Sequence, residues 1–175
     1  VGIWVALADA GIAVAVCHPN RIRSWMQGQG QRAKTDGIDA TLLARYGQRE
    51  QPSPTPLPRP TVRTVAALLD RRQQLVKEQT AEANRRQQTD LPVVQASIDA
   101  LLTVLATLIH DVDDQVWDQV QVDDELRRTV ERLGTVPGIG RLTAMRLAVE
   151  LPELGQVSAK QLAALVGVAP VDRQR

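Results

Sequence analysis

The sequence predicts a mainly α-helical protein with a small α/β part at its N-terminus. Apolar residues recur at helical spacing through most of residues 61–122. The one short run rich in β-branched residues, IAVAV at 12–16, is the only strand candidate. Aromatic residues make up 2% of the 175 residues, which argues against a β-sandwich, while 43% hydrophobic residues suffice for a buried core.

The composition also excludes several functional classes. A single cysteine rules out a disulfide framework and a multi-cysteine zinc site, and two histidines make a His-rich metal site a poor hypothesis. So few aromatic residues argue against reading bases by stacking. Residues 98–131 carry a net charge of −7, against +2, +3 and +3 for 1–50, 51–97 and 132–175. The basic parts permit a polyanionic partner without proving one.

Residues 1–50 are expected to form the α/β part. Residues 3–10 suit a short helix that Gly11 stops, and 12–16 suit a buried, parallel strand. A turn or two of helix follows at 21–26, and Thr35 can cap a helix from Asp36 to about Gly47. That helix places Ile38, Leu42 and Tyr46 on one stripe.

The apolar start of the chain does not predict a membrane segment. No basic run precedes residues 1–17, Asp9 and Gly11 interrupt them, and a spanning helix needs about 20 apolar residues. We expect a cytoplasmic protein of a reducing compartment with no membrane partner.

The rest of the chain is expected to be helical. Residues 51–60 hold five prolines and predict a stiff linker and a domain boundary. Residues 61–122 predict an antiparallel helical pair, the second helix beginning at Pro92, and packing explains this pair better than a site does. Residues 123–175 predict helix, tight turn, helix, loop and helix, and the acidic stretch 111–125 is expected to face solvent.

Two acidic residues at a helix start form the first candidate site. In KTDGIDA, Asp36 and Asp39 lie three residues apart, on one side of the helix. Two carboxylates this close repel each other unless a cation such as Mg²⁺ or Mn²⁺ lies between them. The helix macrodipole alone accounts for Asp36. Asp39 borders the apolar stripe, and a carboxylate that points toward a core needs a partner. On spacing alone, however, two ordinary helix-start carboxylates without a metal remain the favoured explanation.

A glycine turn forms the second candidate site. In VPGIGRLTA at 136–144, Gly138 and Gly140 allow a ligand close to the backbone, and Arg141 adds a cation. Pro-Gly-Ile-Gly between amphipathic helices is typical of a helix-hairpin-helix that binds DNA without reading its sequence, although a plain turn uses the same residues.

Weaker candidates lie near the acidic pair. Cys17 and His18 lack a third group that would orient them for catalysis, so packing explains them better. Four basic side chains flank the acidic pair, namely Arg21, Arg23, Arg32 and Lys34. They could contact a phosphate backbone or be ordinary surface charges.

Both motifs in this order resemble the DEDD transposases of the insertion-sequence one-ten family, also called the 110/116/902 type. The matching segments are HPNRIRSWMQGQGQRAKTDGIDATLLARYG at 18–47 and LGTVPGIGRLTAMRLAVELPELGQVSAKQLAALVGVAP at 133–170. The resemblance implies that 1–50 is the C-terminal part of an RNase H-like, RuvC-like catalytic domain. It implies a coiled coil at 61–122 that helps the protein oligomerise, and a helix-hairpin-helix at 123–175.

The resemblance also implies a chemistry. Four acidic residues bind Mg²⁺ in this family, and the last two map onto Asp36 and Asp39. Lys34, Gly138, Gly140 and Arg141 are then expected to contact DNA, and some members act with a structured guide RNA. The family's first Asp and its Glu lie upstream of the matched segments, and its nucleophilic serine is expected beyond Arg175. We therefore expect a fragment of a transposase that has little activity by itself.

Two other functions remain open at this point. A DNA-binding or oligomerising module without chemistry would keep its salt-dependent DNA affinity when Asp36 and Asp39 are replaced by alanine. A RuvC-type nuclease would cut four-way junctions without joining strands.

Overall fold

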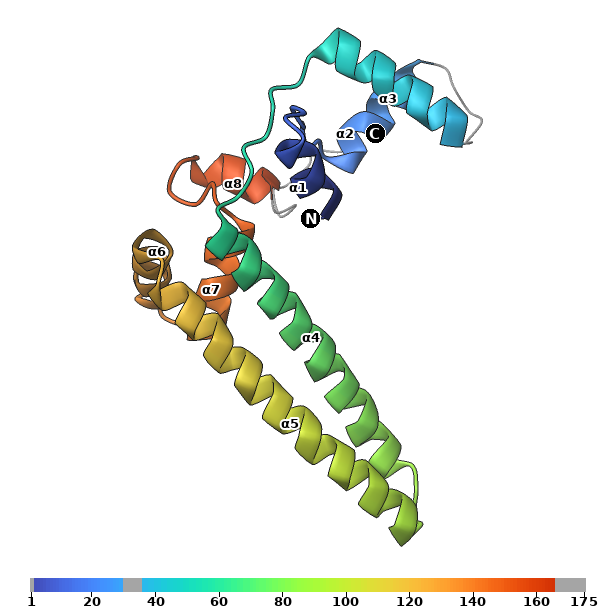
Figure 1. Ribbon diagram of the computed structural model, residues 1–175, viewed down its shortest axis with the longest axis vertical. Helices are drawn as coiled ribbons and strands as arrows, with labels where there is room; N and C mark the ends of the chain where they lie inside the picture. Colours follow the sequence, from blue (N-terminus) through green and yellow to red (C-terminus); the bar gives the residue numbers. More distant parts are fainter. Residues whose placement is uncertain (1, 30–35, 166–175) are drawn as a thin grey trace, which may run out of the picture. The chain divides into compact units, whose positions relative to one another are not determined.

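The computed structural model describes residues 2–29 and 36–165, with the side chains of Asp36, Ile38, Ala164 and Leu165 excepted. Eight helices account for most of these residues and none of them lies in a strand, which confirms the mainly α prediction. The chain divides into two compact units, Val1–Pro58 and Arg59–Arg175 (Figure 1).

The first unit contains α1 (Gly2–Asp9), α2 (Pro19–Gly28) and α3 (Asp36–Glu50). Gly11, at φ +74°, ends α1, and the amide of Ile12 donates to the carbonyl of Leu7 at 2.9 Å. This left-handed closure is the stop that the sequence predicted, since glycine adopts positive φ without steric cost.

The strand predicted at 12–16 is wrong for the described residues. The segment has no regular secondary structure and no strand beside it, and Ile12 and Val16 are 53% and 59% exposed. Thr55 forms two hydrogen bonds with this segment. Its amide donates to the carbonyl of Val14, and its Oγ1 accepts from the amide of Val16, each at 2.8 Å. β-Branched residues favour an extended backbone, but a ladder also needs a second strand to supply its hydrogen bonds.

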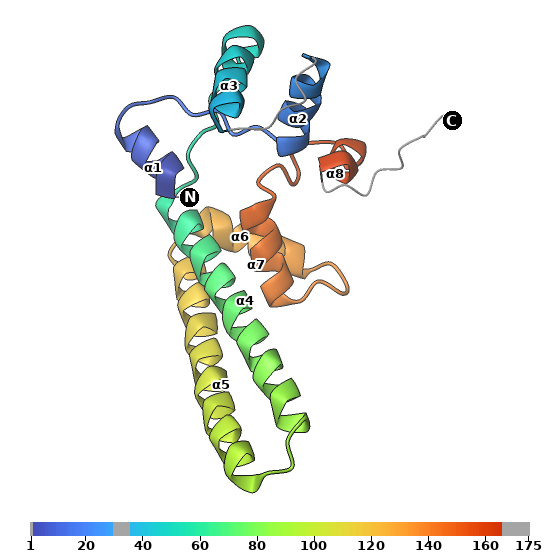
Figure 2. The same cartoon turned by 90° about the vertical axis from the view of Figure 1, so that its right-hand side faces the viewer.

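The second unit is built on a long helical pair. Helices α4 (Pro60–Gln87) and α5 (Pro92–Gln121) run antiparallel over their length (Figure 2), as predicted. Each begins with proline at its first position, where the missing N–H costs no helical hydrogen bond. By length and composition, α5 is also the one helix of the described part that could span a bilayer, and a single such helix is weak evidence for a membrane segment.

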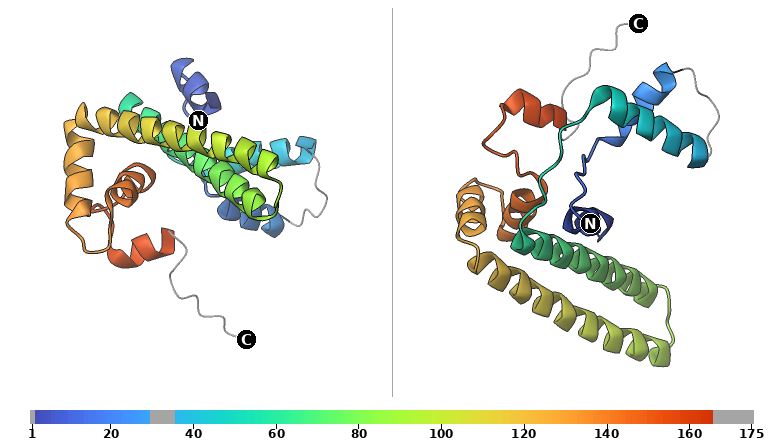
Figure 3. Two further views of the ribbon diagram at one scale, coloured as in Figure 1. Left: turned by 90° about the horizontal axis from the view of Figure 1, so that it is seen from below. Right: turned by 45° about the horizontal axis from the view of Figure 1, so that its top comes forward.

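Three shorter helices follow: α6 (Asp124–Gly134), α7 (Arg141–Glu150) and α8 (Ala159–Leu165) (Figure 3). Helices α6 and α7 close one end of the pair, where the most deeply buried side chains gather. From α4 and α5 these are Val65, Leu69, Val116 and Val120, and from α6 and α7 they include Val130 and Ala144. This shared cluster of buried side chains therefore holds α6 and α7 against the end of the helical pair.

A buried carboxylate ties the linker end to α6. Asp123 is 8% exposed, and its Oδ1 accepts from the amide of Leu126 at 3.0 Å and from Arg59 at 2.7 Å. The prediction that 111–125 faces solvent is therefore wrong at Asp123, which caps α6 and needs a cationic partner because it is buried.

Replacing Asp123 with alanine should lower the free energy of unfolding of this unit by about 1–2 kcal/mol, since the cap and the hydrogen bond from Arg59 are both lost while Arg59 keeps its pair with Glu125 at 3.3 Å. Thermal unfolding of the purified chain measures this. Asp123→Asn retains a capping oxygen and should lose clearly less, and equal losses for the two variants would contradict the capping role.

The far end of the helical pair should open in acid. A hydrogen bond from Arg86 on α4 lowers the pKa of Asp99 on α5. A carboxyl whose pKa is depressed by folding stabilises the fold above its ordinary range and stops doing so as the pH falls through its lowered value. The protection of amides at the start of α5 against hydrogen exchange, corrected for the intrinsic pH dependence of exchange, should therefore fall below about pH 4. Asp99→Asn should remove that pH step, and an unchanged step would exclude this ion pair as its cause.

Candidate nucleic-acid interface

The turn between α6 and α7 presents its backbone to solvent. Gly138 has φ +88°, and the amide of Ile139 donates to the carbonyl of Val136 at 3.0 Å. Ile139 packs against the core, which anchors the turn, whereas Gly138 and Gly140 are exposed. A Cβ built on either glycine meets nothing within 4 Å. Packing within the protein therefore does not require glycine at position 140. A large ligand that approaches the backbone there would require it, because a side chain would stand in its way.

The start of α7 is open to an anion. Gly140 is its N-cap residue, with φ −73° and ψ 163°, and within the described ranges no side chain caps this helix. The amides of the first turn have no carbonyl partner within the helix. They carry the positive end of the helix dipole, which favours a phosphate.

A cation lies at the same helix end. Arg141 is exposed, and its guanidinium carbon lies 3.3 Å from the centroid of the Trp117 ring on α5. The structure therefore brings together three of the four predicted DNA contacts, Gly138, Gly140 and Arg141. The fourth, Lys34, lies outside the described residues.

Sequence analysis missed two further basic residues of α6. Arg128 and Arg132 are exposed and four residues apart, so they lie on one side of the helix that leads into the turn. That spacing before the glycine turn is the signal that could have identified them. Arg127 differs, because it pairs with Asp124 at 2.9 Å and lowers the pKa of that carboxyl through the hydrogen bond.

The acidic pair of the first unit lies at the start of α3. Asp36 is the first residue of the helix, and Asp39 is half-buried one turn later. The stripe that follows packs against α2, since Leu42 and Tyr46 are buried and the Trp25 and Tyr46 rings meet edge to face at 5.4 Å. Among the described side chains, no three of His, Cys, Asp or Glu gather as metal ligands would.

The weaker candidate residues that the structure describes in the first unit show no arrangement that indicates a site. His18 is the N-cap of α2, and its Nδ1 accepts from the amide of Asn20 at 3.2 Å. Cys17 is a half-buried free thiol. Arg21 and Arg23 lie exposed on α2, and Arg32 is outside the described residues.

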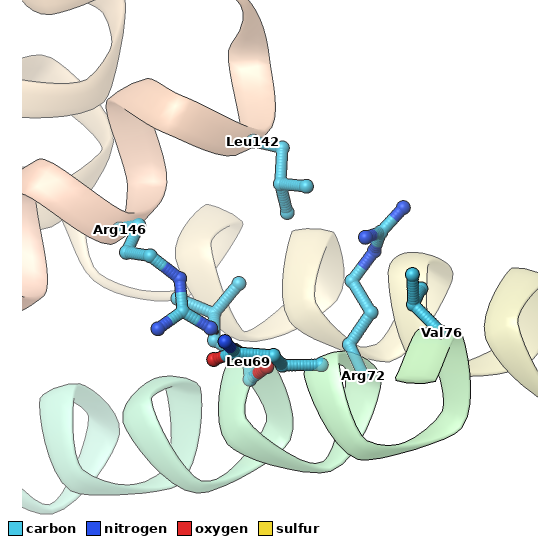
Figure 4. A pocket seen from close by; sticks show the side chains of 6 residues that line it. Leu69, Arg72, Val76, Leu142 and Arg146 are labelled. Atoms are coloured by element: carbon cyan, nitrogen blue, oxygen red, sulfur yellow. Dashed lines mark hydrogen bonds between the residues drawn. The ribbon is translucent and has the colours of Figure 1, made fainter. Parts of the chain in front are cut away.

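A shallow groove of ≈ 240 Å³ between α4 and α7 also contains two arginines (Figure 4). Arg146 reaches from α7 to the carbonyl of Leu69 at 2.9 Å and pairs with Glu150 at 2.6 Å. Arg72 pairs with Asp113 of α5 at 2.5 Å. Oxygen atoms of the protein pair with both guanidinium groups. The residues of this groove therefore hold α7 against α4 and do not form a second anion site.

Comparison with known proteins places both motifs in one family. Residues 2–89 match a family described as transposase, of the DEDD IS110 type, and residues 130–174 match one described as transposase, IS116/IS110/IS902 family. This chain belongs to the IS110-type transposase family. The two matches contain the acidic pair and the glycine turn, and they confirm the resemblance that the sequence indicated.

Two curated relatives of this transposase-family chain are pilin gene-inverting proteins, from Moraxella bovis and Moraxella lacunata. Each is 33% identical over 183 residues, which covers 98% of this chain and 54% of the relative. The chain thus spans about half the length of the curated relatives it matches.

Proposed function

We propose that this chain binds the DNA backbone through its glycine turn and, within an intact recombinase, serves the cleavage and joining of DNA strands during transposition of an insertion sequence. The observation that carries the proposal is the exposed backbone at Gly138 and Gly140, next to the uncapped start of α7. Backbone amides and one arginine suit a phosphate, and such contacts hold DNA in place without reading its sequence. The turn then acts as a helix-hairpin-helix.

We further propose that Asp36 and Asp39 are two of the oxygen ligands of a divalent cation, Mg²⁺ or Mn²⁺, in the intact protein. The half-buried position of Asp39 suits a carboxylate that has a cation as partner. The family resemblance implies four acidic ligands, so we expect this pair to form only part of the site. A bound cation would polarise phosphoryl oxygens. In the RNase H-like domain that we propose for this part of the intact protein, a sheet would cover the exposed apolar side chains of Ile12 and Val16.

The relatives favour recombination over the RuvC-type alternative. Inverting a gene requires that DNA strands be cut and then rejoined in a new order, whereas a junction nuclease only cuts. The pilin gene-inverting proteins are named for such an inversion. We therefore place joining, as well as cleavage, in the function of the intact protein, which would act in the cytoplasm on the nucleoid.

An exposed apolar stripe of α5 supports a homo-oligomer. Exposed apolar side chains recur there at heptad-like spacing, at Val94, Leu101, Val104 and Leu108. Such spacing is typical of a coiled-coil contact, and a second copy of the chain would cover it. Because family members can use a structured guide RNA, such an RNA is a further partner to test.

Salt-dependent DNA binding tests the proposed interface. The purified chain should bind a labelled mixed-sequence duplex with an affinity that falls steeply as salt rises. Gly138→Val should weaken binding, whereas Asp36→Ala and Asp39→Ala should leave it unchanged. A structured RNA added as competitor shows whether the same surface accepts it. An affinity for DNA that is unchanged in Gly138→Val would rule out this interface.

Strand cleavage tests the metal proposal separately. Because the pair is only part of a site, the 175-residue chain should show almost no Mg²⁺-dependent nicking or joining by itself. Appreciable nicking that Asp39→Asn abolishes would show that this chain already carries a complete site.

A further inference from the structure

We propose that Trp117 of α5 is a positioning residue for the DNA contact: its indole ring holds the guanidinium of Arg141 at the start of α7, ready to meet a phosphate. The inference rests on the DNA-binding function proposed above and adds to it a residue outside both sequence motifs. Trp117 belongs to α5 of the long helical pair, where packing is the ordinary role of an aromatic side chain.

The geometry is that of a stacked cation on a ring face. The guanidinium carbon of Arg141 lies 3.3 Å from the ring centroid, well inside the roughly 6 Å within which a cation and an aromatic face attract each other. Trp117 is half-buried and packs against the core of the second unit, so its ring is fixed. Arg141 is exposed, and no ion pair to a carboxylate of the described residues engages it. Arg146, one turn further along α7, is in contrast tied to Glu150 and to the carbonyl of Leu69.

Stacking leaves the donors of Arg141 available. The ring contacts the flat face of the guanidinium, while its N–H groups point outward in the plane and can bind phosphate oxygens in pairs. A free arginine side chain loses much of its conformational freedom when it binds, and one already held on a ring loses less. Arg141 is itself the first residue of α7, so a phosphate at the uncapped amides would lie within reach of its side chain.

A double-mutant cycle on the full chain tests this role, with fluorescence anisotropy of a short labelled DNA duplex as the readout. Trp117→Leu should weaken binding by about two- to fivefold, the value of an exposed cation–π contact, and leave the salt dependence unchanged. Arg141→Gln should weaken it and reduce the slope of log K against log salt by about one. When Arg141→Gln is already present, Trp117→Leu should have no further effect.

Conservative variants separate positioning from structural support. Trp117→Phe keeps an aromatic face and should recover part of the affinity. Arg141→Lys keeps the charge without the flat face and should weaken binding about as much as Trp117→Leu, and it can be measured even where Trp117→Leu folds poorly. The folded fraction of every variant is determined by circular dichroism and by titration to the binding end point.

The outcomes distinguish this inference from the function on which it rests. Equal losses from Trp117→Leu with and without Arg141 would show that the ring only supports the fold, and would overturn the inference. Full affinity in Arg141→Lys would overturn it as well. If Gly138→Val and Arg141→Gln both leave DNA binding intact, the proposed interface is itself wrong, and the role of Trp117 fails with it.

Discussion

Replacing Gly140 with aspartate should weaken DNA binding by about 10- to 100-fold, because it puts a negative charge where the phosphate would lie, and two like charges some 4 Å apart at a protein surface repel by about 1–4 kcal/mol. Folding should respond in the opposite direction. Gly140 is the uncapped N-cap of α7, with an extended backbone that any residue adopts and open space at its Cβ. An aspartate there accepts hydrogen bonds from the first-turn amides and should raise the free energy of unfolding by about 0.5 kcal/mol.

Opposite signs for stability and binding make this variant a sharp test of the interface. Ala96→Asp adds the same charge at an exposed position in the first turns of α5, about 30 Å along that helix from Trp117. It should reduce DNA affinity much less. Anisotropy titrations and thermal unfolding of both variants measure the two effects. A Gly140→Asp protein that folds well and keeps its affinity would show that no phosphate approaches this helix end.

Local chemistry explains why the helices could be predicted. Pro60 and Pro92 begin the two long helices, and Gly11 closes the first short one, because each of these residues acts on its own stretch of backbone. The glycine turn could be found for the same reason. Its conformation is set by Gly138, and its openness follows from having no side chain there or at Gly140.

What the sequence did not show depends on residues far apart in the chain. Segment 12–16 has the composition of a strand, but a strand is defined by its neighbour, and the described residues supply only Thr55. Asp123 lies in an acidic stretch whose local pattern indicates a solvated face, and its burial depends on Arg59, which is distant in the chain. The stacking of Arg141 on Trp117 likewise joins two helices, and no local pattern encodes it. The acidic pair at Asp36 and Asp39 stays a prediction, because its remaining ligands would be distant in sequence.

The buried end of the helical pair should be the part of the fold least tolerant of substitution. Leu69 of α4 is 1% exposed and packs in the cluster shared by α4 to α7, while its carbonyl accepts from Arg146 of α7. Leu69→Ala removes buried carbon atoms and leaves a cavity, which should cost about 2–5 kcal/mol of the free energy of unfolding. Against a total of about 5–15 kcal/mol for a typical domain, this is a large fraction.

The same substitution at an exposed leucine provides the matched control. Leu91, the N-cap of α5, is 62% exposed, so Leu91→Ala should change the free energy of unfolding by no more than about 0.5 kcal/mol. Urea unfolding of both variants measures the difference. Leu69→Ala should also weaken DNA binding near its unfolding midpoint, because the cluster that holds α6 and α7 sets the geometry of the glycine turn. Similar small losses for the two variants would mean that α4 does not pack on α7 as described, and the rigid support of the turn would have to come from elsewhere.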